Sequence, residues 1–455
     1  MNAREFAMKL LRQINEEQVL SHEALAALEQ SGLEPRDRAL VNRLVHGTLE
    51  RQWTIDRILE KKTGKPVTKL KPGIRNILRM GVYQLLFLTQ IPDSAVCNES
   101  VKLTKKSGYA GLSGFVNGVL RGIARDAEAA GSKELCLAGY AKGYNEEERF
   151  CFQYSVPPEL AGYYRERYPD EAEAMFEAFL KESGTAVRLN KSRGSLEDLK
   201  KVLTDEGIAF HDGLLPNTLR MERSGSPAAS EAFRMGLFSI QDESSALAGN
   251  VLPLKAGMRV LDLCAAPGGK TVHAADELSV LGGGSVTARD LSMEKIERIR
   301  EHAERVGLTN VTCEKRDALT FDAALNEAFD IVLADLPCSG LGVIGRKPDI
   351  KIKTGLQDII NLAEIQRGIL KNAVRYVKNG GYLCYSTCTI TKVENDSNCD
   401  YIESLGFRPY DVTEAVPERL RKRYRNGRLQ LFPQDGTDGF FLAVYQKKDG
   451  TDEQN

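Results

Sequence analysis

The stretch Arg259-Val-Leu-Asp-Leu-Cys-Ala-Ala-Pro-Gly-Gly-Lys-Thr271 constrains the fold more than any other part of the sequence. Its apolar run, Val260 to Leu263, ends in small residues, as a buried parallel strand does before a tight turn and a helix near Gly269. Such a unit brings bare backbone close to a nucleotide-like ligand at the carboxyl end of a sheet. The stretch is not a Walker A loop, whose first glycine would fall on Cys264. The stretch does not match the dinucleotide-binding motif G-x-G-x-x-G either, because Pro267 stands where that motif needs a flexible backbone. These observations leave open the interpretation that the stretch is an ordinary turn between strand and helix that binds no ligand.

From about residue 251 onward, strand patterns alternate with helix patterns. Strands are expected at Val260–Leu263, Ser285–Asp290, Val311–Lys315, Phe329–Asp335, Gly381–Ser386 and Phe440–Tyr445. The segments between them carry apolar residues at helical spacing, including a long helix around Leu356–Val377. This order predicts an α/β domain over residues 251–448, with a doubly wound, largely parallel sheet and helices on both faces.

Two further regions precede this domain. Residues 1–135 carry apolar side chains at helical spacing and predict a compact all-helical bundle. A linker is expected at about 131–150, where Gly, Glu and Lys are frequent. Residues 150–250 mix strand-like and helical patterns, which predicts a small α+β subdomain that guides a substrate.

Composition narrows the class of protein. A hydrophobic content of 42% is ordinary for a soluble globular chain, and 455 residues suffice for about two to four domains. No apolar run approaches the roughly 20 residues of a membrane span, so we expect a cytoplasmic protein without membrane contact. The nine cysteines include no C-x-x-C pair and the five histidines are scattered, so neither a disulfide framework nor a metal site is expected.

Charge is balanced over the whole chain but not locally. The net charge is −1, which indicates no global attraction to nucleic acid. However, residues 61–79 and 419–428 each contain several Lys and Arg and no acidic residue. Either cluster is compatible with contacts to phosphates, and either is equally compatible with an ordinary solvated surface.

Carboxylates mark the ends of four consecutive predicted strands. They are Asp262, Asp290, Asp317 and Asp335. In a parallel sheet these ends line one crevice, where a ligand lies. Asp290 follows Gly269 at about the separation at which an acid meets ribose hydroxyls, and Asp317 is placed to reach an adenine amino group. This repetition favours an adenosyl ligand over an empty turn.

Two cysteines follow neighbouring strands of the same sheet. Cys338 lies just past the Phe329–Asp335 strand, and Cys388 lies just past the Gly381–Ser386 strand. A free cysteine is often only a small buried hydrophobe. Glycine and hydroxyl residues surround both of these, which favours loops over core and predicts two thiols above the crevice.

Three segments together resemble a known enzyme family. Asp262-Leu-Cys-Ala-Ala-Pro-Gly-Gly-Lys-Thr271, Asp335-Leu-Pro-Cys-Ser-Gly340 and Ser386-Thr-Cys388 resemble motifs of the RNA 5-methylcytosine methyltransferases. The N-terminal helices look like the NusB fold, so nearly the whole chain resembles the bacterial 16S rRNA (cytosine-C5)-methyltransferases of the Sun/RsmB type. The resemblance implies a Rossmann-like S-adenosylmethionine-dependent methyltransferase domain. It also implies an all-α NusB-like RNA-binding domain and a small α+β linker subdomain before it.

The resemblance further implies a reaction. Members of this family methylate carbon 5 of a cytosine in 16S rRNA, at position 967. Carbon 5 is too weak a nucleophile for direct attack, and a thiolate that adds to carbon 6 activates it. The family's nucleophile corresponds to Cys388, and Cys338 would assist release of the product. Asp335 would hold the cytosine ring, and Lys270 would act near the base.

The resemblance also implies where S-adenosylmethionine binds. The expected contacts are Cys264, Ala265, Ala266, Pro267, Gly268, Gly269, Lys270, Asp290, Asp317 and Asp335. RNA is the expected partner, as 16S rRNA or a small-subunit precursor, and no DNA is expected. No particular oligomeric state is implied.

Other functions stay open at this stage. Methylation of a tRNA cytosine is the same chemistry, and the residues do not name the target. A non-catalytic RNA-binding protein of ribosome assembly would not need two thiols at adjacent strand ends. An amino-directed methyltransferase would carry an aromatic residue after the fourth strand to stack the base, and Asp335-Leu-Pro-Cys338 lacks one.

Overall fold

The computed structural model describes residues 1–181, 184–222 and 227–448. It divides into two compact units. The first contains residues 1–181 together with 344–354, and the second contains the rest of the described chain. Each unit is built around its own hydrophobic clusters.

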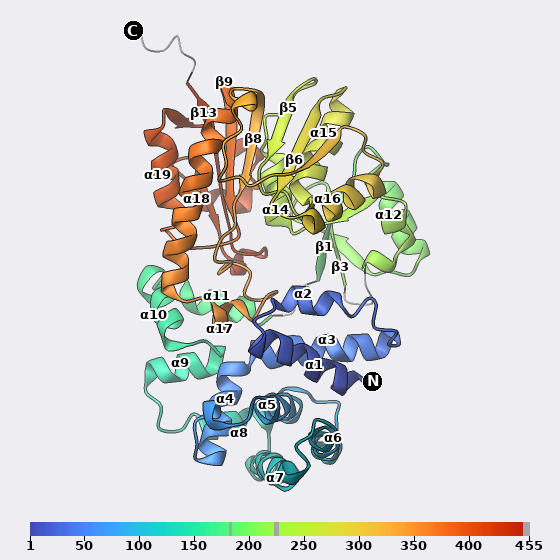
Figure 1. The fold of residues 1–455 in the computed structure, drawn as a ribbon, viewed down its shortest axis with the longest axis vertical. Helices are drawn as coiled ribbons and strands as arrows, with labels where there is room; N and C mark the ends of the chain where they lie inside the picture. Colours follow the sequence, from blue (N-terminus) through green and yellow to red (C-terminus); the bar gives the residue numbers. More distant parts are fainter. Residues whose placement is uncertain (182–183, 223–226, 449–455) are drawn as a thin grey trace. The chain divides into compact units, whose positions relative to one another are not determined.

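The first unit is helical (Figure 1). Its elements are α1 (Ala3–Glu16), α2 (Ser21–Ala26), α3 (Pro35–Glu50), α4 (Gln52–Thr63), η1 (Val67–Lys69), α5 (Pro72–Phe87), α6 (Asp93–Lys106), η2 (Ala110–Leu112), α7 (Ser113–Ala130), α8 (Lys133–Tyr140), α9 (Glu146–Tyr154), α10 (Pro158–Arg167), α11 (Ala172–Phe179) and α17 (Ile350–Lys353). Pro35 and Pro72 open α3 and α5, where the missing N–H would have had no helical partner. Gly64 and Gly131 end α4 and α7 in the left-handed conformation that glycine adopts freely.

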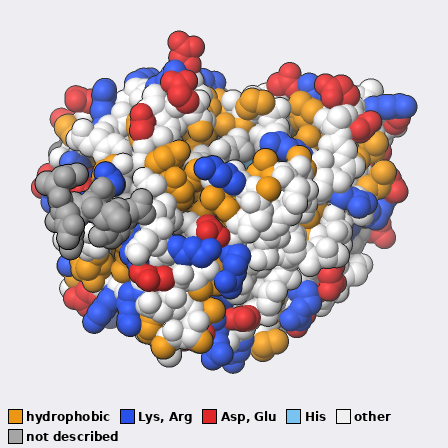
Figure 2. All heavy atoms as spheres, turned by 90° about the horizontal axis from the view of Figure 1, so that it is seen from above, with side chains coloured by type: hydrophobic (Ala, Val, Ile, Leu, Met, Phe, Trp, Pro, Cys, Tyr) orange, Lys and Arg blue, Asp and Glu red, His pale blue; other side chains and the backbone are white. Residues whose placement is uncertain are grey.

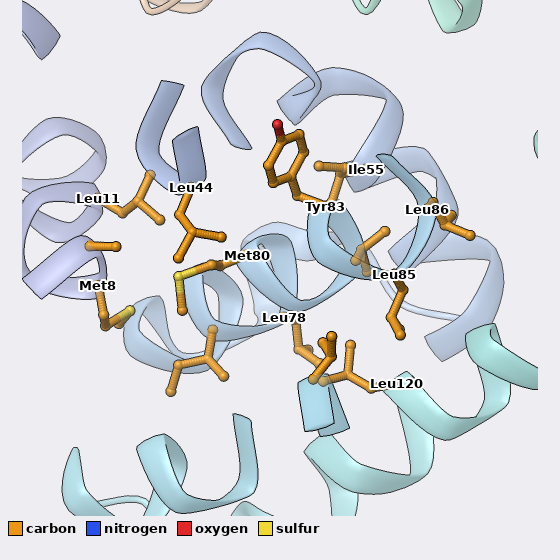
Figure 3. Close-up of a cluster of buried hydrophobic side chains, with 14 of the residues drawn as sticks. Met8, Leu11, Leu44, Ile55, Leu78, Met80, Tyr83, Leu85, Leu86 and Leu120 are labelled. Atoms are coloured by element: carbon orange, nitrogen blue, oxygen red, sulfur yellow. The ribbon is translucent and has the colours of Figure 1, made fainter. Parts of the chain in front are cut away.

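The core of this unit lies where α1, α3, α4, α5 and α7 meet. Figure 3 shows side chains from separate helices pointing toward one another, among them Met8, Leu44, Ile55, Met80 and Leu120. Helix α5 is buried along most of its length, which explains why its apolar residues do not follow a single stripe. The expected all-helical bundle at the N-terminus is confirmed.

Residues 344–354 belong to this helical unit although they follow Cys338 in the chain. The buried Asp349 carboxylate accepts hydrogen bonds from the backbone N–H and the hydroxyl of Ser21. Lys351 donates to the carbonyl of Glu50 at 2.6 Å. Burial lowers the pKa of Lys351 to about 7. Charged side chains with local partners therefore anchor this segment.

The second unit contains a mixed sheet with helices around it. Its elements are β5 (Arg259–Asp262), α15 (Gly269–Leu281), β6 (Ser285–Asp290), α16 (Met293–Val306), β7 (Val311–Lys315), η4 (Ala323–Leu325), β8 (Phe329–Asp335), α18 (Leu356–Tyr376), β9 (Val377–Thr387), α19 (Asp396–Ser404), β10 (Phe407–Pro409), η5 (Thr413–Ala415), η6 (Glu418–Arg423), β11 (Tyr424–Arg425), β12 (Arg428–Leu431), η7 (Pro433–Asp435) and β13 (Phe440–Lys447). The strand order is β11-β12-β13-β9-β8-β5-β6-β7, and β10 pairs with β13. Strands β5 to β9 are parallel, and the pairings that involve β10 to β13 are antiparallel. The expected Rossmann-like fold is confirmed, with an antiparallel extension on one side.

Alternate residues of the central strand pack on opposite faces of this sheet. Val260 of β5 joins a cluster with Ala274 of α15, whereas the next residue, Leu261, joins a cluster with Leu370 of α18. Helices α18 and α19 cover one face, and α14 (Glu243–Asn250) and α15 cover the other (Figure 1). This double cover is why the central strands β5 and β8 read as nearly continuous apolar runs.

The chain reverses its direction across the sheet between β5 and β8. After β5 it continues to β6 and β7 on one side, and it then crosses to β8 and β9 on the other. The carboxyl ends of strands at such a switch point form the crevice in which α/β proteins bind ligands.

A smaller sheet of order β2-β3-β1-β4 lies in the same unit. Its elements are β1 (Thr185–Leu189), α12 (Leu196–Asp205), β2 (Phe210–Asp212), β3 (Thr218–Met221), η3 (Pro227–Ala229), α13 (Glu231–Arg234) and β4 (Phe238–Ile240). The fully buried Arg188 of β1 pairs with Asp276 of α15 at 3.4 Å and ties this sheet to the larger one.

Two features differ from the sequence-based expectations. Residues 131–150 were expected to form a linker, but they contain α8 and the start of α9. Cys136 and Phe152 pack into the helical core, so few apolar residues suffice to hold these short helices. The described chain forms two units rather than three regions, with 150–181 in the helical unit and the two sheets in one unit.

Candidate active site

The turn between β5 and α15 is shaped by small residues. Gly268 adopts a φ of +103°, which strains any L side chain, and a Cβ there would lie 3.3 Å from the Cα of Ile299. The Asp290 carboxylate, at the end of β6, accepts a hydrogen bond from the N–H of Ala266 at 3.0 Å. The turn is thereby held at the carboxyl edge of the sheet, as its sequence predicts.

A buried ion pair lies beside this turn. Lys270, in the first turn of α15, donates to Asp335 at the end of β8 at 2.7 Å. Burial alone would lower the pKa of Lys270, but the Asp335 carboxylate outweighs it and raises that pKa. Asp335 also accepts from the Ser386 hydroxyl at 2.7 Å, and Lys270 reaches Ser245 of α14 at 3.1 Å. Both carboxylate oxygens of Asp335 are thus oriented by β9 and α15.

The two predicted thiols meet above the sheet. The sulfur atoms of Cys338 and Cys388 are 3.1 Å apart. Register explains this contact, because Asp335 and Ser386 are partners in the parallel β8–β9 pair, and a thiol follows each strand. Gly342 donates its N–H to the carbonyl of Cys388 at 3.0 Å, which joins the two loops again.

The surroundings of the two thiols differ. The hydrogen bond with Cys388, burial and the Glu394 carboxylate hold the pKa of Cys338 well above its ordinary value. A raised pKa favours the protonated thiol at Cys338, and either sulfur can be the donor in the contact between the two. Elsewhere in the sheet, burial raises the pKa of Cys384 and of Cys399 to about 12, which makes these thiols inert.

The strand ends fit an adenosyl ligand. Asp290 on β6 and Asp317 just past β7 lie at the same edge of the sheet, because β6 and β7 pair in parallel. The carboxylates of Asp290 and Asp317 accept from the backbone N–H groups of Leu291 and Leu319, which fixes them and leaves oxygen lone pairs for donors of a ligand. Oδ1 of Asp262 is buried at the same edge and has no hydrogen-bond partner among the described residues.

The structure brings the predicted catalytic residues together in two pairs, Cys338 with Cys388 and Lys270 with Asp335. Sequence reasoning missed the supporting residues. Ser245 and Ser386 orient Lys270 and Asp335, and Glu394 binds the loops that carry the thiols. Serine is common on helices and at strand ends, so neither Ser245 nor Ser386 carried a recognisable signal. An acid in the stretch after Cys388 has no periodicity that marks it as buried.

The two basic clusters are partly neutralised inside the fold. In residues 61–79, Lys62, Arg75 and Arg79 pair with acids of the helical unit. In residues 419–428, Arg423 pairs with Asp435, and Arg428 pairs with acids of α19. Figure 2 shows basic and acidic side chains interspersed over the described part of the face that it draws. Contacts of these clusters with phosphates stay a prediction.

Comparison with known proteins adds a family to these features. The model described as 16S rRNA methyltransferase RsmB/F matches residues 250–446, and the NusB family model matches residues 1–125. A probable ribosomal RNA small subunit methyltransferase B of Bacillus subtilis (strain 168) is 36% identical over 457 residues, covering 98% of this chain and 99% of that protein.

Two solved structures share the fold. A crystal structure of a protein named PH0851 matches with a TM-score of 0.81 and 25% identity over 98% of each chain. The structure of NSun6 from Pyrococcus horikoshii with SFG, an analogue of S-adenosylmethionine, matches with a TM-score of 0.56 and 22% identity. This second match covers 64% of this chain and 98% of that chain.

The Rossmann-like domain, the helical NusB region and these matches define an S-adenosylmethionine-dependent methyltransferase of small-subunit ribosomal RNA. More particularly, this chain belongs to the family of ribosomal RNA small subunit methyltransferases B, the Sun/RsmB type. The family resemblance and the cofactor expected from the sequence motifs are confirmed. Within the described part of the chain, no helix is long and apolar enough to cross a membrane.

Proposed function

We propose that this protein methylates carbon 5 of a cytosine in 16S rRNA, at position 967, through a covalent bond between Cys388 and carbon 6 of the base. The pair of thiols 3.1 Å apart, at the ends of neighbouring parallel strands, carries this proposal. Two thiols at one ligand crevice suit a reaction that forms and then breaks a carbon–sulfur bond, and a pure RNA-binding protein has no use for them.

In the first step, the thiolate of Cys388 adds to carbon 6, and the electrons of the C5–C6 double bond make carbon 5 nucleophilic. S-adenosylmethionine, when bound, would supply the methyl group that carbon 5 takes up, and the electron pair of the broken sulfur–methyl bond would stay on its sulfur as S-adenosylhomocysteine leaves. Asp335, held by Lys270 and Ser386, accepts hydrogen bonds from the amino group and the protonated ring nitrogen 3 of the base. A proton on that nitrogen draws electrons from carbon 6 and favours attack there.

In the second step, the carbon 5 proton leaves to a base, and its bonding electrons re-form the C5–C6 double bond. The carbon–sulfur bond breaks, and its electron pair returns to Cys388 as a thiolate, so no oxidant or reductant is consumed. The S–H of Cys338 donates a hydrogen bond to the departing sulfur. The raised pKa of Cys338 keeps that proton in place, which suits assistance to the leaving group.

The proposed cofactor contacts follow the same edge of the sheet. The turn Cys264–Gly269 and Lys270 face it from β5 and α15, and Asp290, Asp317 and Asp335 stand at the following strand ends. We propose that Asp290 binds the ribose hydroxyls and that Asp317 binds near the adenine amino group.

The target is tested by mapping 5-methylcytosine in RNA from cells that lack this protein. We expect the methyl group at position 967 of 16S rRNA to disappear, to return with the wild-type protein, and to stay absent with Cys388→Ala. Loss of a tRNA 5-methylcytosine with unchanged 16S rRNA would show that tRNA is the substrate instead. An unchanged pattern in both RNAs would contradict the proposal.

A further inference from the structure

Glu394 is a fully buried carboxylate in the segment between β9 and α19, with an exposed fraction of 0%. Its Oε1 accepts from the N–H of Ser339 at 2.8 Å and from the amide of Gln366 at 3.0 Å. Its Oε2 accepts from the hydroxyls of Ser339 and Thr391, both at 2.6 Å. A buried charge is tolerated only when several donors surround it, and these four donors meet that requirement.

The donors come from both loops that carry the thiols. Ser339 directly follows Cys338, and Thr391 lies in the loop that begins at Cys388. The hydroxyl of Ser339 also contacts that of Thr389 at 2.7 Å. One carboxylate therefore joins the two loops immediately beyond the sulfur atoms, which fixes how far apart the loops can move.

Neighbouring amides hold the other sides of the same loops. Gln366 of α18 donates to the carbonyl of Pro337 at 2.9 Å, just before Cys338. Asn395 accepts from the hydroxyl of Thr387 at 2.6 Å and donates to the carbonyl of Thr389 at 3.1 Å, on either side of Cys388. Without Glu394, the Cys388 loop would lose the bond of Thr391 but keep the two bonds of Asn395 to Thr387 and Thr389. The loop after Cys338 would lose both bonds of Ser339 to Glu394 and keep only the contact of the Ser339 hydroxyl with Thr389.

We propose that Glu394 is a positioning residue that sets the separation of the two thiols, so that Cys338 reaches the sulfur of Cys388 when the product is released. This inference rests on the proposed covalent reaction and deepens it. Its consequence is specific, because loss of Glu394 disturbs the release step more than the formation of the carbon–sulfur bond.

Two substitutions separate the hydrogen bonds from the charge. The side-chain oxygen of Glu394→Gln can still accept from Ser339 and Gln366, and its NH₂ can donate to the two hydroxyls, which accept as well as donate. Glu394→Ala removes all these bonds. Asp330→Asn is the matched control, because Asp330 accepts from Arg259 and Lys378 at the opposite end of β8.

The measured quantity is the ratio of covalent protein–RNA adduct to released 5-methylcytosine, with a 16S rRNA transcript as substrate. We expect Glu394→Ala to raise this ratio about tenfold or more, as the loss of buried hydrogen bonds permits. Glu394→Gln should stay within about threefold of the wild type, as a retained hydrogen-bond set predicts. Asp330→Asn should leave the ratio unchanged.

The ratio distinguishes positioning from stability, because a partly unfolded enzyme loses adduct and product in proportion. An unchanged ratio in Glu394→Ala, or an equal rise in Glu394→Gln, would overturn the proposal. If Glu394→Ala does not fold, Ser339→Ala must raise the ratio in the same direction, and an unchanged ratio there overturns the proposal. If even Cys338→Ala forms no adduct, the covalent reaction itself fails and this inference fails with it.

Discussion

Asp262 and Asp335 lie at the ends of adjacent parallel strands, yet their hydrogen-bond partners differ. Asp335 pairs with Lys270 at 2.7 Å and accepts a hydrogen bond from the Ser386 hydroxyl. Asp262 is 1% exposed, and its carboxylate accepts only the hydroxyl of Thr271 among the described residues. Burial raises the pKa of Asp262 to about 7. Protonation of Asp262 is therefore linked to folding near neutral pH.

The raised pKa of Asp262 makes the folded protein less stable as the pH rises. Below about pH 4 the carboxyl is protonated in both the folded and the unfolded protein, and the stability that protonated Asp262 allows is fully present. Between about pH 4 and 7 the unfolded protein releases the proton and the folded protein keeps it. The stability that protonated Asp262 allows is thus lost as pH rises, by a few kcal/mol at most, roughly 1.4 kcal/mol per unit of pKa difference.

Asp262→Asn is expected to remove this part of the pH dependence, because asparagine resembles the protonated acid and still accepts from Thr271. Chemical denaturation of wild type and variant between pH 5 and 8 measures it. The variant should gain stability over the wild type as pH rises. Buried His273, with its pKa lowered to about 4, shifts stability in the opposite sense, but it does so in both proteins. Parallel pH curves would contradict this account of Asp262.

Among the elements, the loops after β8 and β9 depend on one close backbone approach. A Cβ at Gly342 would lie 2.0 Å from the carbonyl oxygen of Gly439 and 2.8 Å from that of Cys388. Both neighbours are backbone, so neither can swing aside as a side chain does. A side chain at this position must therefore push the Cys388 loop away from the start of β13.

Gly342→Ala is expected to destabilise the protein by about 1–3 kcal/mol, as overpacking does. It should also lower kcat about tenfold or more while KM for S-adenosylmethionine stays within about twofold, because the cofactor edge is not displaced. Steady-state kinetics with a 16S rRNA transcript measures both constants. Gly162→Ala is the control and should keep wild-type kinetics, because the added Cβ meets no atom within 4 Å other than the neighbouring backbone of its own helix, α10. Wild-type turnover in Gly342→Ala would contradict the predicted displacement.

Sequence patterns placed the strands of the larger sheet well. They did not predict helix α8 or the place of residues 344–354 in the helical unit. The strands from β5 to β8 were placed to within about a residue. For β5 and β8 the reason is burial on both faces, which makes their apolar runs nearly continuous. Helix α8 was missed because only Cys136 is buried in it, and one buried residue makes no period. The place of residues 344–354 in the helical unit has no local signal, since Asp349 and Lys351 look like ordinary surface charges until their partners are known.

At the scale of the whole molecule, a catalytic sheet and a helical NusB-like region form a methyltransferase of ribosomal RNA. The thiol pair was predictable from sequence because each cysteine directly follows a recognisable strand. Charge was less informative, because several basic residues of the two clusters are paired within the fold, among them Arg75, Arg79 and Arg423. The chemistry of the cysteines, rather than net charge, therefore carries the functional conclusion.

The covalent reaction is tested most directly by adduct formation with a 16S rRNA transcript, read as a protein–RNA band that survives denaturation. Cys338→Ala should accumulate this band, because Cys388 still adds to the base and its departure is no longer assisted. Cys388→Ala, and the double substitution, should give none. A band with Cys388→Ala and none with Cys338→Ala would exchange the two roles. No band in any variant, with an active wild-type enzyme, would contradict the covalent route.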